Sequence, residues 1–166
     1  SGVIVDVVDP IWKIANINID KTNKKVTADL IATDKYLTGV ENSTLTTSDI
    51  TISVDGDTNA NTVITKSLTE PTFFSNAITG MKEIKYTLTL TNFEEATRQT
   101  GKSFLEYSGA VKITVAAGTI TDVPSETGGS TSQTQSNSSK EQEFQLGQVD
   151  FLNPRFIYEY ANTTIN

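Results

Sequence analysis

Short segments of this chain alternate apolar and polar residues one for one. The clearest is 83–92, where Tyr86, Leu88 and Leu90 are separated by threonines. Because successive side chains of a β-strand point to opposite faces, this alternation predicts a strand with one face in a core and the other toward water. Three further segments repeat the pattern: 25–31, 49–54 and 109–116. A chain built from such segments is expected to fold as packed β-sheets.

The composition agrees with an all-β fold. Hydrophobic residues make up 36% of the chain, below the roughly 45–50% of ordinary globular domains. Threonine, serine and asparagine fill much of the difference, and threonine suits the water-facing side of a half-exposed strand. About seven to nine short strands, spaced about 8–12 residues apart with turn signals between them, predict a Greek-key β-sandwich.

The first long predicted strand changes face part-way along. Trp12 and Ile14 share one face, whereas Ile17 and Ile19 share the other. This change of parity predicts a β-bulge, or a switch between sheets, around residues 15–16. Trp12 is expected in the core, because it shares the face of Ile14.

Charge and residue usage exclude several classes of function. The net charge is -7, and the absence of a basic patch disfavours nucleic acids and anionic membrane surfaces as partners. The chain contains no cysteine and no histidine, which excludes disulfides, a thiolate nucleophile, a Cys/His zinc site and any imidazole-based triad. No signal peptide or transmembrane run is found in the sequence, and no membrane insertion is expected.

The beginning of the sequence recurs near its end. Residues 5–16 read VDVVDPIWKIAN and residues 149–162 read VDFLNPRFIYEYAN, so that Pro10 matches Pro154. The two extra residues of the second copy preserve the inward and outward faces of a strand, because the side-chain period is two. A unit that restarts about 144 residues later predicts a tandem array of repeats.

A polar tract interrupts this unit. Residues 124–143 read PSETGGSTSQTQSNSSKEQE and contain no large apolar residue. Such a composition is typical of a flexible linker or a long surface loop. We favour an inserted loop, after which 144–152 returns as the final strand. The predicted organisation is then an end strand of a preceding repeat at 1–9, a sandwich repeat at 10–152, and the first strand of the next repeat at 153–166.

Several phrases resemble the bacterial immunoglobulin-like repeats of Gram-positive surface and extracellular proteins. They are IANINIDKTNKKVTADLIATDKYL, SDITISVDG, KYTLTLTNF and GAVKITVAAGTITD, and together they cover roughly residues 10–122. The resemblance implies an immunoglobulin-like sandwich that serves as a stalk or adhesion module in a long tandem run. It brings no shared catalytic residues. Many relatives continue with a short turn where this chain has Val123-Pro124 and the polar tract.

A candidate calcium site lies at the end of segment 49–54. Asp55, Asp57 and Asn59 place oxygen-bearing side chains at alternate positions, as calcium-binding loops do. The alternative is a plain polar turn, because Asp55-Gly56 is a strong hairpin signal whose partner strand is expected at 62–68. Calcium is the only cofactor that the sequence suggests.

Aromatic and acidic pairs are the remaining candidates for a site. Phe73 and Phe74 are adjacent, so they cannot both face inward; one is expected in the core and the other on the surface, as a candidate ligand-binding residue. Glu94 and Glu95 fall where a short helix is expected to begin, a position that favours carboxylates through the helix dipole. They are therefore not expected to be a catalytic pair, and no enzymatic activity is predicted.

The sequence thus predicts a structural repeat of a bacterial cell-surface or cell-wall protein, acting extracellularly as a stalk or spacer. Its partners would be the neighbouring repeats of the same chain. One alternative is a binding module for a host protein or glycan, with Phe73, Phe74 and the loop at 55–61 as its binding face. A second is an accessory domain of a secreted polysaccharide-active enzyme.

Overall fold

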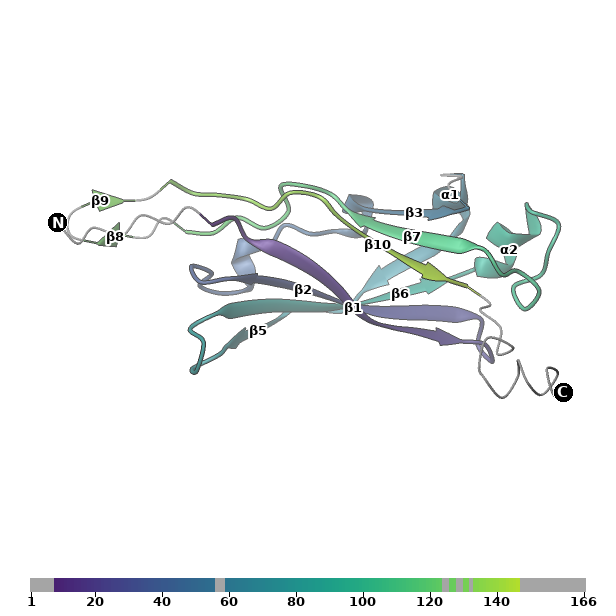
Figure 1. The fold of residues 1–166 in the computed structure, drawn as a ribbon, viewed down its shortest axis with the longest axis horizontal. Coiled ribbons are helices and arrows are strands. Elements are labelled where there is room, and N and C mark those ends of the chain that lie inside the picture. Colours follow the sequence, from purple (N-terminus) through teal and green to yellow (C-terminus); the bar gives the residue numbers. More distant parts are fainter. Residues whose placement is uncertain (1–7, 56–58, 124–125, 128–129, 132, 147–166) are drawn as a thin grey trace, which may run out of the picture.

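The computed structural model describes residues 8–55, 59–123, 126–127, 130–131 and 133–146, and these form a two-layer β-sandwich (Figure 1). The larger sheet has five strands and the smaller has three, all antiparallel to their neighbours. The larger sheet contains β1 (Ile11–Asp20), β2 (Lys25–Asp34), β6 (Lys82–Thr91), β4 (Thr65–Leu68) and β5 (Thr72–Ser75). The smaller contains β10 (Lys140–Gln145), β7 (Ala110–Val115) and β3 (Ile50–Val54).

The strand order is that of an immunoglobulin-like sandwich. In the larger sheet the order is β1-β2-β6, and the outer edge of β6 is shared by β4 and β5. β4 pairs with the second half of β6 and β5 with the first half, so the two short strands occupy one edge position. Four strand positions then face the three of the β10-β7-β3 sheet, which is the Greek-key arrangement of constant-type immunoglobulin domains. The predicted fold class is confirmed.

The core lies between the sheets and is built from the alternating residues of each strand. Tyr86, Leu88 and Leu90 of β6 are buried, as are Trp12 and Ile14 of β1. The predicted bulge in β1 is confirmed, because the pairing of β1 with β2 shifts register between Ala15 and Asn18. Further core residues come from the partner strands: Val26, Ala28, Leu30, Ile50, Ile52, Val111, Ile113 and Val115.

The predicted hairpin at Asp55-Gly56 is wrong. β3 pairs with β7, and the chain then crosses through α1 (Ala60–Val63) to β4, which belongs to the other sheet. The outer edge of β3 is covered by side chains instead of a strand: Asn61 Oδ1 accepts a hydrogen bond from Ile52 N at 2.9 Å, and Lys66 Nζ donates one to Ile50 O at 2.5 Å. Ser53, which the alternation of segment 49–54 assigns to the water-facing side, is buried on the strand against which α1 packs.

The remaining short helices lie in the loops. The turn-rich stretch after β2 contains two 3-10 turns, η1 (Val40–Asn42) and η2 (Thr47–Asp49). The helix expected after β6 is present as α2 (Phe93–Arg98), with Glu94 and Glu95 in its first turn as predicted. Gly101, just beyond it, has a φ of 84°, which favours glycine at this position.

The described residues of the polar tract take part in backbone pairing that its composition does not predict. We call the described residues of 116–139, namely 116–123, 126–127, 130–131 and 133–139, the ribbon; they include the paired strands β8 (Glu126–Thr127) and β9 (Ser130–Thr131). Its two sides are joined by backbone hydrogen bonds, such as Asp122 N to Gln135 O at 3.0 Å. The final strand begins at Lys140 rather than Phe144, because backbone pairing with β7 requires no apolar side chains.

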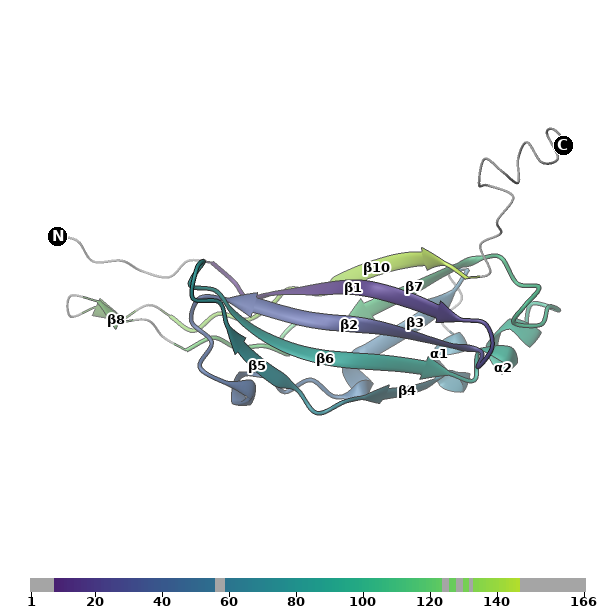
Figure 2. The ribbon, with the colours of Figure 1, turned by 90° about the horizontal axis from the view of Figure 1, so that it is seen from below.

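The chain enters and leaves the sandwich at opposite ends (Figures 1 and 2). β1 and β10 lie side by side and run in the same direction. We call the end where β1 begins the N-terminal end and the end where β10 finishes the C-terminal end. The ribbon projects beyond the N-terminal end, whereas α1 and α2 lie at the C-terminal end. The predicted end strand at 1–9 and next-repeat strand at 153–166 fall almost wholly outside the described residues.

Candidate functional site

Phe73 and Phe74 lie on the outer edge of the larger sheet. They belong to strand β5. Phe73 packs against the core, whereas 57% of the Phe74 surface is exposed. The prediction of one inward and one outward ring is confirmed. Phe74 is therefore the more exposed of the two rings, and Ile78, 96% exposed, lies in the turn that follows.

The structure describes two of the three residues of the candidate calcium site, Asp55 and Asn59. Asp55 has a φ of 51° and accepts a hydrogen bond from Ala110 N at 3.3 Å. Asn59 precedes α1 as its N-cap residue, without a side-chain capping bond. Asp57 lies outside the described residues. The part of the chain that the structure describes contains no group of three or more acidic residues arranged to hold a metal, and calcium binding stays a prediction.

Asp55 lies beside Tyr107, a neighbour that the sequence did not indicate. Burial and the nearby Asp55 carboxylate raise the pKa of the Tyr107 hydroxyl. Gly109 permits this arrangement, since a Cβ at that position would lie 2.6 Å from Asp55 Oδ1 and would also overlap Tyr107. These contacts bring Asp55 against the loop before β7 and favour a structural role for its carboxylate.

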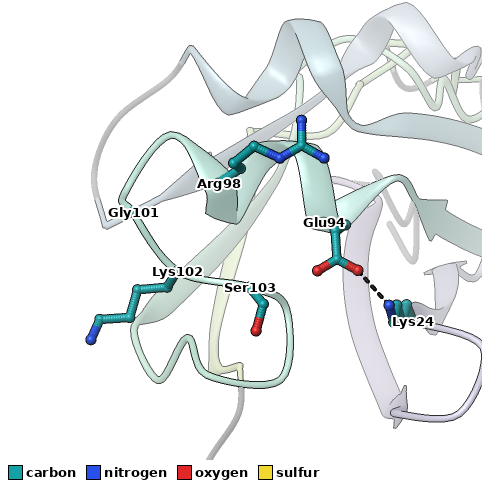
Figure 3. A pocket seen from close by; sticks show the side chains of 6 residues that line it. All are labelled: Lys24, Glu94, Arg98, Gly101, Lys102 and Ser103. Atoms are coloured by element: carbon teal, nitrogen blue, oxygen red, sulfur yellow. Dashed lines mark hydrogen bonds and ion pairs between the residues drawn. The ribbon is translucent and has the colours of Figure 1, made fainter.

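A cleft of about 470 Å³ opens at the C-terminal end of the sandwich (Figure 3). The turn between β1 and β2 supplies Lys24, and α2 with the loop after it supplies the rest of the lining: Glu94, Arg98, Gly101, Lys102 and Ser103. Three cations and one carboxylate therefore line a cleft in a chain whose net charge is -7. Such a lining suits an anionic group.

Glu94 is firmly held inside this cleft. Its Oε1 accepts a hydrogen bond from Lys24 Nζ at 2.6 Å, and its Oε2 accepts one from Phe104 N at 3.2 Å. The Lys24 ammonium and then the Phe104 amide lower the pKa of the Glu94 carboxyl. A carboxyl group that stays ionised in this way is a poor general acid.

The other two cations of the cleft differ in their pairing. Arg98 forms an ion pair with Glu95, one turn back on α2. Lys102 has no ion pair with any described residue, and its side chain points away from Glu94 into solvent (Figure 3). Lys102 is thus the cation of the cleft that is available to a partner. Sequence reasoning missed the cleft, because Lys24 and Glu94 are 70 residues apart.

Comparison with known proteins adds no relative: no family model, curated protein or solved structure matches this chain. Among the described residues, no helix has the length and apolar character that a bilayer span requires.

Proposed function

We propose that this chain is a non-catalytic spacer repeat of a bacterial cell-surface protein, with an immunoglobulin-like sandwich as its unit. The observation that supports this most is the position of the terminal strands: β1 begins at one end of an elongated sandwich and β10 finishes at the other. Copies joined in series would therefore extend end to end. The restart of the sequence at residue 149 provides the reason to expect such a series.

The pairing of the terminal strands suits a chain under tension. β1 is bonded along its length to β2, and β10 is bonded to β7. Force applied at the two chain ends acts along these strands, so it shears each ladder and loads many hydrogen bonds at once. Force across the open end of a hairpin would instead break the bonds one after another. The first geometry resists force better than the second.

Single-molecule pulling tests this proposal. With handles at the two chain ends, we expect one cooperative unfolding event at a high peak force. The control uses Asp9→Cys and Lys35→Cys, which place handles on adjacent ends of β1 and β2 and open that hairpin from one side. A peak force for the end-to-end geometry that is equal to or below the control force would contradict a spacer that carries tension.

A second candidate is a binding module for a host protein or glycan, and the exposure of Phe74 and Ile78 favours it. A flat aromatic ring at an exposed edge can stack on a sugar or pack against a protein. Screening the chain against glycan arrays and host surface proteins tests this candidate. Binding that Phe74→Ala removes and Leu105→Ala keeps would support it, because Leu105 is 61% exposed at the C-terminal end. If the domain is instead an accessory module of a polysaccharide-active enzyme, it should bind plant or microbial polysaccharides, and Phe74→Ala should remove that binding.

A further inference from the structure

The cleft at the C-terminal end offers hydrogen-bond donors to a ligand, whereas its carboxylate is already satisfied. Both oxygens of Glu94 are occupied, one by Lys24 Nζ and the other by Phe104 N. An ammonium group carries three N–H donors, and Lys24 uses one of them on Glu94. The Lys102 ammonium has neither an ion pair nor a hydrogen bond to any residue that the structure describes. A ligand that fills this cleft must therefore be rich in acceptors.

The loop after α2 holds two of the lining residues in place. Lys102 N donates to Thr97 O at 3.3 Å, and Ser103 N donates to Glu106 Oε1 at 3.2 Å. Ser103 Oγ accepts a hydrogen bond from Glu106 N at 3.3 Å, so its O–H is still a donor for a ligand. Because the loop is fixed by these bonds before a ligand arrives, binding costs less ordering of the protein.

The charge of this end favours an anion whose charges are widely spaced. The cleft is lined by three cations and one carboxylate, and Lys21 and Lys25 add positive charge on and beside the same turn. Three further carboxylates lie close by, those of Asp20, Glu95 and Glu106, in a chain of net charge -7. They would repel a nucleic acid, which carries one charge for about every 1.7 Å of its length. A polymer with separated carboxylates meets less repulsion.

The donors are spread across the cleft instead of converging on one point. Figure 3 shows Lys24 and Lys102 on opposite sides of Glu94, with Ser103 between the two lysines. The cleft volume of about 470 Å³ falls within the range of roughly 300–1,000 Å³ that is usual for ligand sites. A short stretch of polymer that bears carboxylates and hydroxyl groups matches this layout better than a compact anion does.

We propose that the cleft binds a uronic-acid polysaccharide, with a sugar carboxylate at Lys102 and neighbouring sugar oxygens at Lys24 and Ser103. This site goes beyond the spacer function, because it would allow one repeat to adhere to an acidic glycan while it extends the rod. It also gives the second candidate function, a glycan-binding module, a location distinct from Phe74.

A hyaluronan hexasaccharide, which bears a carboxylate on alternate sugars, tests the site by NMR titration of the whole chain at neutral pH. We expect shifts at the amides of Lys24, Lys102 and Ser103. The affinity should be at least about five times that of glucuronate alone, because the oligosaccharide engages several donors at once. Equal affinity for the monosaccharide, or shifts only at other residues, would overturn the proposal. So would tighter binding of a heparin or single-stranded DNA oligomer, since it would assign the cleft to densely charged polymers.

Two variants should change the affinity in opposite directions. Lys102→Gln, at an exposed position, should lower it about two- to fivefold. Glu94→Gln removes the carboxylate of the lining and frees Lys24, so it should raise the affinity by a similar factor. The matched controls are Lys13→Gln on β1 and Glu143→Gln on β10, which make the same charge changes at exposed positions away from the cleft and should leave the affinity unchanged.

Equal effects of each variant and its control would show that only the net charge of the chain matters, and they would overturn the site. Weaker binding by the Glu94 variant would do the same, because the proposal requires its carboxylate to oppose the ligand. Neither result alters the peak force expected in the pulling experiment, so failure of the glycan site and failure of the spacer function are distinguishable.

Discussion

The indole Nε1–H of Trp12 donates a hydrogen bond to Thr119 Oγ1 at 2.8 Å, across 107 residues of sequence. Both residues are buried, at 2% and 3% exposure. The bond joins the first strand of the sandwich to the base of the ribbon. Because Trp12 also packs against Tyr86 in the core, with ring centroids 6.1 Å apart, the ribbon is tied directly to the hydrophobic interior.

Removal of the acceptor in this pair should destabilise the domain. Thr119→Val leaves the buried indole N–H without a partner, and we expect the free energy of unfolding to fall by about 1–3 kcal/mol. Denaturant unfolding measures the change. The matched control is Thr114→Val on the water-facing side of β7, with an expected change under about 0.5 kcal/mol. In a double-mutant cycle with Trp12→Phe, strictly additive effects would show that the two residues are not coupled.

The anchor of the ribbon should be sensitive to Asn137. Asn137→Ala removes the acceptor of the Thr119 and Ile120 amides, and the cost of two buried unpaired donors is about 3 kcal/mol. Amide hydrogen exchange should also accelerate at Gly118 and Asp122, which pair across the ribbon. Gln133→Ala, an exposed position on the same ribbon, is the control. Unchanged exchange in the Asn137 variant would mean that the ribbon is held by other contacts.

Asn61 protects the free edge of the smaller sheet. Its Oδ1 accepts the Ile52 N–H and also a hydrogen bond from Lys66 Nζ at 2.8 Å. Asn61→Ala should lower the free energy of unfolding by about 1–2 kcal/mol and increase self-association, because an uncovered edge strand pairs readily with other chains. Light scattering and denaturant unfolding report the two effects. Asn18→Ala on the exposed face of β1 should change neither quantity.

The ion pair between Lys24 and Glu94 makes part of the stability depend on pH. The pKa of Glu94 is lowered in the folded state from an ordinary value of 4.5, so below that value the unfolded chain binds the proton more readily. The contribution of the ionised Glu94 to the free energy of unfolding is therefore present above about pH 4.5, and it is lost as the pH falls through the folded-state pKa. Over this range the wild type should lose more stability than Glu94→Gln. Glu143→Gln on exposed β10 is the control, and parallel curves for the wild type and Glu94→Gln would exclude the linkage.

Much of the sandwich could be predicted from local patterns. The alternation of Tyr86, Leu88 and Leu90 identifies a strand and its buried face without knowledge of its neighbours, because the side-chain period of a strand is fixed at two residues. The parity change after Ile14 likewise located the bulge, and adjacency in the sequence was enough to separate Phe73 from Phe74. Each of these features depends on residues close together in the sequence.

The tertiary structure decided the features that depend on distant partners. An Asp-Gly turn signal could not reveal that β3 pairs with β7, because the choice of a pairing partner is made by the packing of the whole sheet. The polar composition of 124–143 concealed the ribbon, since its order comes from backbone hydrogen bonds and from the burial of Asn137. The cleft exists only because the fold brings Lys24 to Glu94. The sequence by itself determined the strands and their faces through local periodicity, whereas pairing, the ribbon and the cleft were decided by contacts between segments far apart in the chain.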